Sequence, residues 1–114
     1  MELRELEKAL MKENGWLFHK LSEQKGLIQE KAQTEHDYRV ALAVKITELR
    51  TEGTPVTIMS DLCRGYKPIA KLKLDRDIAK GMADACRQAI IATQASMSGI
   101  QTMISTRKEE MKLL

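Results

Sequence analysis

Thr51-Glu52-Gly53-Thr54-Pro55 is the stretch that decides the fold, because it separates two long segments with helical patterning. No proline precedes it, and Gly53 can supply the left-handed residue that closes a helix. Thr54 and Pro55 then have the order expected of a helix start, with threonine as the N-cap and proline at the first helical position. The sequence therefore predicts one long helix that ends here and a new helix that begins.

The segment before this stretch has apolar residues at helical spacing. Asn14-Gly15 is the one credible interruption, because both residues favour turns. We therefore expect a long helix over residues 16–51 and leave open whether residues 1–13 form a separate helical arm. The apolar residues make three successive stripes: Leu3, Leu6 and Leu10; then Leu17, Leu21 and Ile28; then Tyr38, Leu42, Ile46 and Leu49.

The segment after this stretch predicts a short helix over residues 55–64 and a long one over residues 68–112. Gly65 can end the first, and Lys67-Pro68 begins the second by the same preference for proline in a first turn. A seven-residue pattern along the second helix, apolar at eleven of its fourteen positions, is typical of a coiled-coil seam. It comprises Ile69, Leu72, Arg76, Ala79, Ala83, Cys86, Ile90, Thr93, Met97, Ile100, Ile104, Arg107, Met111 and Leu114.

A second stripe beside this seam is apolar or small, so the face to be buried is wide. Such a face exceeds what one antiparallel partner helix covers, which favours self-association into an oligomeric helical bundle. The alternative is a monomer whose helices curl over both stripes. In either case we predict an all-α protein, with residues 1–114 as a single domain built on a long antiparallel helical hairpin. The second stripe comprises Ile78, Met82, Ala85, Ala89, Ala92, Ser96, Gly99 and Met103.

The composition suits helices that pack through aliphatic side chains, with 43% hydrophobic and 4% aromatic residues. The net charge of +3 is concentrated in residues 38–80, which carry nine cations against five acids. Cys63 and Cys86 are too few and too far apart for a disulfide framework, so we expect two small buried thiols. No apolar signal core or membrane-spanning run is present. We expect the protein to be cytoplasmic.

A basic cluster at the start of the last helix is the candidate ligand site. Cations near a helix N-terminus oppose the helix dipole unless an anion is present, and an aromatic ring among them could stack on a base. Asp75 and Asp77 neutralise part of the cluster, so an ordinary solvated face remains the alternative. The cluster comprises Arg64, Tyr66, Lys67, Lys71, Lys73 and Arg76, with Lys80 beside it.

No pattern for catalysis is present. Glu35-His36-Asp37 places a histidine between two carboxylates, but consecutive helical residues point about 100° apart and cannot converge on one ion. The sequence has no glycine-rich phosphate loop, nucleophile elbow or paired metal-binding histidines. We therefore expect no enzyme activity, no metal ligands and no cofactor.

The runs Glu35–Ala43, Leu49–Thr57 and Asp61–Gly65 resemble small all-helical proteins encoded by phages and prophages of Gram-positive bacteria. The resemblance implies an accessory role, in replication or recombination or in disarming a host defence. We hypothesise an oligomer that binds a host or phage protein, or sequesters a small anionic nucleotide signal. The alternatives are a nucleic-acid-binding factor in phage replication or recombination, and an assembly factor that coats a partner.

Overall fold

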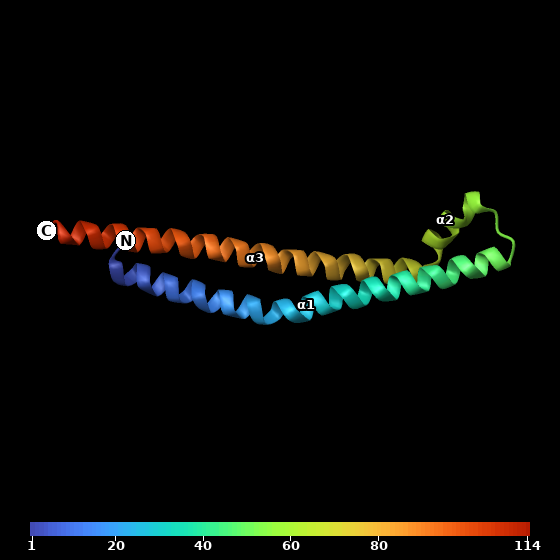
Figure 1. The fold of residues 1–114 in the computed structure, drawn as a ribbon, viewed down its shortest axis with the longest axis horizontal. Coiled ribbons are helices and arrows are strands. Elements are labelled where there is room, and N and C mark those ends of the chain that lie inside the picture. Colours follow the sequence, from blue (N-terminus) through green and yellow to red (C-terminus); the bar gives the residue numbers. More distant parts are fainter. The chain divides into compact units, whose positions relative to one another are not determined.

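The computed structural model describes residues 1–114 and contains three helices and no strand. They are α1 (Leu3–Thr51), α2 (Val56–Gly65) and α3 (Lys67–Lys112), shown in Figure 1. α1 and α3 pack as an antiparallel hairpin, and α2 lies in the connection between them. The structure confirms the all-α hairpin with a short connecting helix. None of the helices has an apolar stretch long enough to cross a membrane.

α1 begins earlier than predicted and continues without a break through Asn14-Gly15. The separate arm over residues 1–13 is therefore not formed. A glycine inside a helix costs only about 1 kcal/mol relative to alanine, and packing of this segment offsets that cost, since Leu6 is buried. The other two helices begin and end within one residue of the predicted bounds.

Gly53 closes α1 as predicted, with the left-handed φ of 78°. Its N–H donates to Arg50 O at 3.0 Å, and the N–H of Thr54 donates to Leu49 O at 2.9 Å. These two hydrogen bonds are the Schellman pattern, which satisfies carbonyls that would otherwise lack a partner at the helix end.

The start of α2 differs from the prediction, because the N-cap is Pro55 and not Thr54. Pro55 has an extended conformation (φ −59°, ψ 136°), and no side chain caps the helix. The N–H of Thr54 belongs to the closure of α1. The two helix ends are therefore only a few residues apart, and the connection is short.

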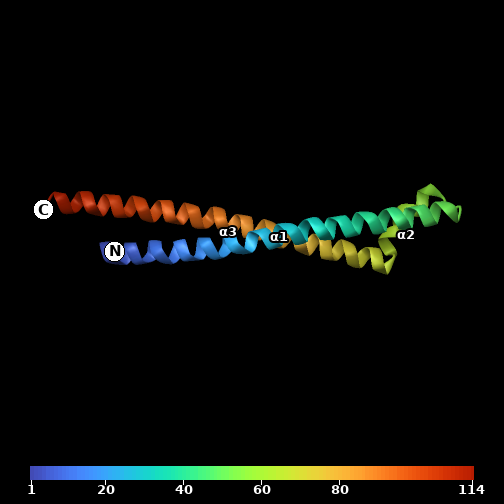
Figure 2. The same ribbon diagram turned by 60° about the horizontal axis from the view of Figure 1, so that its bottom comes forward.

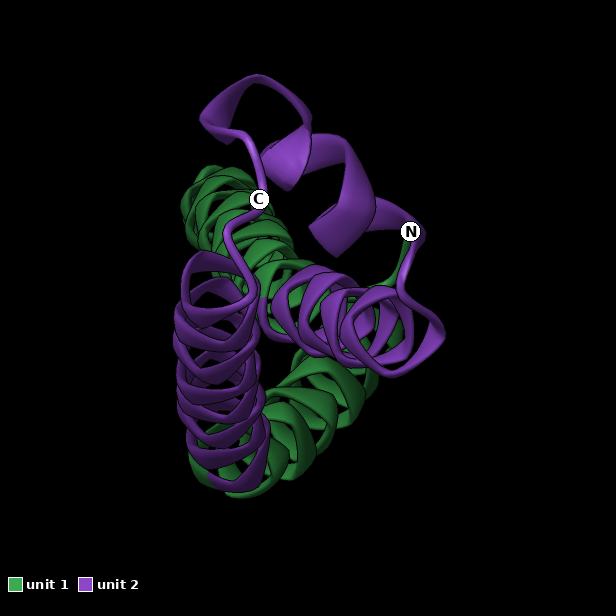
Figure 3. Cartoon of the chain, turned by 90° about the vertical axis from the view of Figure 1, so that its right-hand side faces the viewer, with its two compact units in different colours: residues 1–25, 84–114 green, residues 26–83 purple.

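The chain divides into two compact units, drawn in green and purple in Figure 3. Each unit pairs a segment of α1 with a segment of α3, and both helices can be followed in Figure 2. Unit 1 comprises Met1–Lys25 and Asp84–Leu114. Unit 2 comprises Gly26–Ala83 and includes α2. That residues 1–114 form a single domain stays a prediction.

Unit 1 has a thin core along the seam between its two helical segments. The thiol of Cys86 lies 3.4 Å from Lys20 O on α1, and the guanidinium of Arg107 donates to Met1 O at 2.7 Å. These contacts fix the antiparallel pairing of the two segments. The buried residues of unit 1 are Leu6, Cys86, Ile90 and Thr93.

Unit 2 has a larger core because α2 covers one side of the hairpin. Leu49, Met59 and Cys63 form a buried cluster, with Leu42 and Ile46 packed against it. The stripe from Tyr38 to Leu49 is thus a core stripe, as predicted. Both cysteines are free and buried, which confirms the expected buried thiols.

The seven-residue pattern of α3 is buried or half-buried from Ile69 through Arg107, and exposed at Met111 and Leu114. The prediction of a seam along α3 is therefore confirmed over most of its length. On α1 the prediction was wrong for Leu21 and Ile28, which are exposed. The second stripe of α3 is also exposed except at Ala89, which is half-buried. Much apolar surface of this chain therefore has no cover within the chain.

We expect Gly53→Ala to lower the free energy of unfolding by about 1 kcal/mol, because an L side chain is strained at this positive φ. Gly81→Ala is the matched control. Gly81 is helical and a Cβ there would meet nothing within 4 Å, so alanine should stabilise the protein by about 0.5–1 kcal/mol. Chemical denaturation measures both, and equal effects of the two substitutions would contradict this account of the α1 closure.

Candidate functional site

The most developed concavity is a groove in unit 2, which we call the α2 groove. It has a volume of about 750 Å³, within the range of pockets that bind ligands. Its floor is apolar and is built on the buried cluster of α1 and α2, with Ile69 of α3. The groove is lined by Tyr38, Leu42, Ile46 and Arg50 of α1, by Val56, Met59, Ser60, Cys63 and Arg64 of α2, and by Ile69, Ala70, Lys73, Leu74 and Asp77 of α3.

Three cations, one from each helix, line the α2 groove: Arg50, Arg64 and Lys73. No salt bridge joins any of them to an acid of the chain. The one carboxylate of the groove, Asp77, is held by Arg76 at 3.0 Å. The groove therefore combines an apolar floor with an excess of positive charge.

The predicted basic cluster does not converge on one site. Arg64 and Lys73 line the α2 groove, whereas Lys71 is paired with Asp75 at 2.7 Å. Tyr66 does not line the groove, and Lys45 lies over its ring at 4.0 Å from the ring centre. Lys67 is exposed at the start of α3 and does not line the groove.

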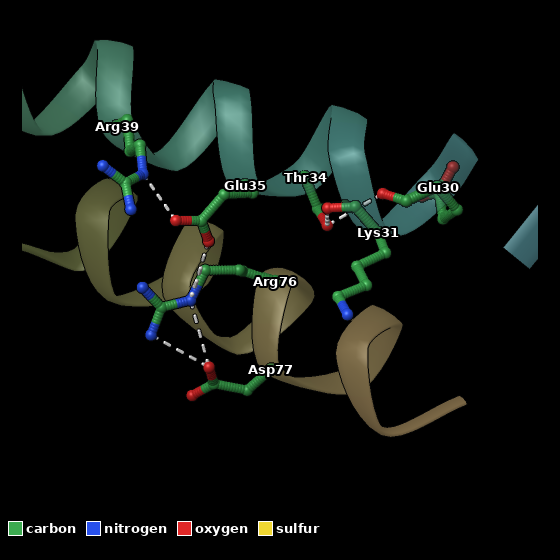
Figure 4. A network of polar contacts seen from close by, with 7 residues as sticks. All are labelled: Glu30, Lys31, Thr34, Glu35, Arg39, Arg76 and Asp77. Atoms are coloured by element: carbon green, nitrogen blue, oxygen red, sulfur yellow. Dashed lines mark hydrogen bonds and ion pairs between the residues drawn. The ribbon is translucent and has the colours of Figure 1, made fainter. Parts of the chain in front are cut away.

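Arg76 has a structural role between α1 and α3 of unit 2 (Figure 4). Its guanidinium lies 4.4 Å from the ring centre of Tyr38, donates to Asp77, and approaches Glu35 of α1 at 3.6 Å. Glu35 also pairs with Arg39 one turn away. The hydrogen bond with Asp77 raises the pKa of Arg76 above its ordinary value. Arg76 is therefore occupied by neighbours within the chain.

Glu35-His36-Asp37 forms no ion site, because its three side chains have different partners. Glu35 pairs with the two arginines, and His36 Nδ1 lies 3.1 Å from Asp37 Oδ1. Gln33 also donates to Asp37, at 2.8 Å. The contact with His36, which has the larger effect, and the contact with Gln33 lower the pKa of Asp37. No group of three or more His, Cys, Asp and Glu side chains is placed to share a metal ion.

A second groove lies in unit 1 and has a volume of about 710 Å³. Trp16 forms one wall and carries Lys20 over its ring at 4.7 Å, while Ala92, Thr93 and Ser96 line the α3 side. Beyond Trp16 this groove offers few apolar side chains. It is therefore a weaker candidate than the α2 groove.

Arg50 and the apolar floor of the α2 groove were not predicted from the sequence. Arg50 follows Leu42 and Ile46 at intervals of four, so a shared helix face was readable from the sequence. These apolar residues were assigned to the core, which is correct. The missing information was that α2 covers this face incompletely, and only the packing of α2 reveals that.

No family model matches this chain, and neither the curated proteins nor the solved structures include a match to it. The resemblance to phage-encoded helical proteins therefore stays a prediction. The case for function depends on the geometry of the site.

We expect Arg76→Ala to lower the free energy of unfolding, through loss of the contact with the Tyr38 ring and of the bridge to Glu35. Lys71→Ala is the control, because its ion pair lies on an exposed face of α3 and should contribute little. Urea denaturation of the two variants measures the difference. An Arg76→Ala variant as stable as the control would contradict a structural role for this arginine.

Proposed function

We propose that this protein is a non-enzymatic binding protein whose α2 groove receives an acidic, partly apolar segment of a partner protein. The observation that carries the proposal is the combination of an apolar floor with three cations that have no acidic partner in the chain. An amphipathic helix can lay its apolar face on such a floor while its acids meet the cations.

Binding without turnover agrees with the residues of the groove. Neither histidine of the chain lines it, and its carboxylate Asp77 is engaged by Arg76. Ser60 and Cys63 line the groove without a neighbouring base in the lining to activate them. The groove thus has binding groups but no pair of groups suited to acid and base roles.

A small anionic nucleotide is the second candidate, favoured by the volume of the groove and its three cations. Base stacking is less well supported, because the one aromatic ring in the lining, Tyr38, has Arg76 over it. Nucleic acid is supported less still. Lys71 and Arg76, which would track a phosphate backbone, are paired with Asp75 and Asp77.

The resemblance to phage proteins suggests a setting for this binding. In that setting the protein is an accessory factor in the cytoplasm of an infected bacterium, and its partner is a host or phage protein. An acidic segment held in the α2 groove would be unable to make its normal contacts. Blocking a host protein in this way would disarm a host defence.

Selection from a random peptide library on the full chain tests the proposal. We expect enriched peptides to place apolar residues at helical spacing beside Asp or Glu, and the Arg64→Glu/Lys73→Glu variant to bind them at least about tenfold more weakly. Val56→Asp should also weaken binding without unfolding the chain, because Val56 lines the groove and is 83% exposed.

The matched control is Lys80→Glu/Lys108→Glu, which makes the same charge change outside the groove and should bind as the unaltered chain does. Enriched peptides without acids, or equal loss of binding in both double variants, would contradict the proposal. If no acidic peptide is selected but nucleotides raise the melting temperature of the protein, the nucleotide hypothesis replaces this proposal.

A further inference from the structure

Unit 1 carries an apolar patch that no part of the chain covers. Three of its residues, Met11, Phe18 and Leu21, are exposed on α1, with Phe18 at 65% and Met11 at 75% exposure. Spacings of seven and three place them on one face of the helix. Ile91 of α3 is exposed as well and is the fourth member. We call these four residues the unit 1 patch.

The heptad register shows which side of the seam these residues occupy. Leu21 lies three heptads before Leu42, and Phe18 lies four heptads before Ile46. On α3, Ile91 is three heptads from Ala70, which lines the α2 groove together with Leu42 and Ile46. The unit 1 patch therefore has the same heptad positions as the side of unit 2 that α2 covers.

This comparison shows what the patch lacks. In unit 2, Met59 and Cys63 of α2 pack on these positions and make a buried cluster with Leu42 and Ile46. Unit 1 contains no third helix, so the four apolar residues of the patch have no cover within the chain. Exposed large apolar side chains gathered on one face indicate an interaction surface.

The exposed area of the chain is of the size that favours a second copy as the cover of the patch. The chain exposes 8498 Å², whereas a folded monomer of 12.9 kDa exposes about 6,300 Å². The excess of about 2,200 Å² lies in the range that each protomer of an obligate dimer buries, about 1,000–2,500 Å². This excess belongs to the whole chain, and the unit 1 patch contributes to it. A second copy of the chain is a partner that buries an area of this size.

We propose that the unit 1 patch is the self-association surface of this protein and packs against the same patch of a second copy. The interface is isologous, because each copy contributes the same residues about a two-fold axis. Phe18, the most exposed aromatic ring of the chain, is the residue expected to contribute most. The α2 groove is not part of this interface. A result that contradicts self-association therefore leaves the proposed ligand binding unaffected, and the reverse also holds.

Sedimentation of the full chain across a range of concentrations tests this proposal. The unaltered chain should sediment at twice 12.9 kDa, and Phe18→Glu should weaken the dimer by at least about thirtyfold. Met103→Glu is the matched control: it is a similarly exposed apolar residue of unit 1, placed in the second stripe of α3, and should remain dimeric. Phe18→Ala, which adds no charge, should stay helical and still weaken the dimer by about tenfold.

A monomer at every concentration would overturn the proposal. So would a dimer that survives Phe18→Glu but dissociates in Met103→Glu, because the second stripe would then be the interface. Loss of helicity in Phe18→Glu does not obscure the result, since Phe18→Ala reports on the same ring without an introduced charge.

Discussion

The antiparallel seam between α1 and α3 is the constraint on which the rest of this structure depends. α3 contributes mainly small residues to its buried side, among them Ala79, Ala83 and Cys86, and no large side chain of the chain is fully buried. Small residues let the helix backbones approach closely but remove little apolar area from water. The hairpin therefore has a thin core, and α2 adds a further cover to unit 2. The incomplete fit of this cover leaves the groove proposed as the binding site.

Polar side chains at the seam fix its pairing. Arg76 occupies a seam position and contacts Tyr38 and Glu35 on α1, while Arg107 donates to the backbone of Met1. A shift of one helix along the other would separate these partners and leave half-buried charges without them. Polar residues in a coiled-coil seam commonly select one register at some cost in stability. Because these contacts occupy its guanidinium, Arg76 is not free to bind a ligand. Within the basic cluster, Arg76 therefore has a structural role, and Arg64 and Lys73 are the candidates for ligand binding.

Much of the fold was readable from the sequence, because its signals are local. The heptad pattern of α3 and the glycine at position 53 act through spacing and backbone conformation. The interruption at Asn14-Gly15, which the sequence left open, is absent because a glycine inside a helix costs less than packing contributes. The candidate site was predicted only in part. Arg64 and Lys73 were predicted, but that they line one groove with Arg50 depends on how α2 packs, which the sequence does not show. The sequence indicated that Asp75 and Asp77 neutralise part of the cluster, but not that Arg76 also contacts Tyr38 and Glu35 of α1.

Thermal unfolding as a function of protein concentration tests most directly the claim that one chain does not bury enough apolar surface by itself. If folding requires a second copy, the melting temperature rises steadily with concentration, because dissociation and unfolding are coupled by mass action. A melting temperature that is constant from the nanomolar to the high micromolar range would contradict this account and show that the hairpin is stable as a monomer.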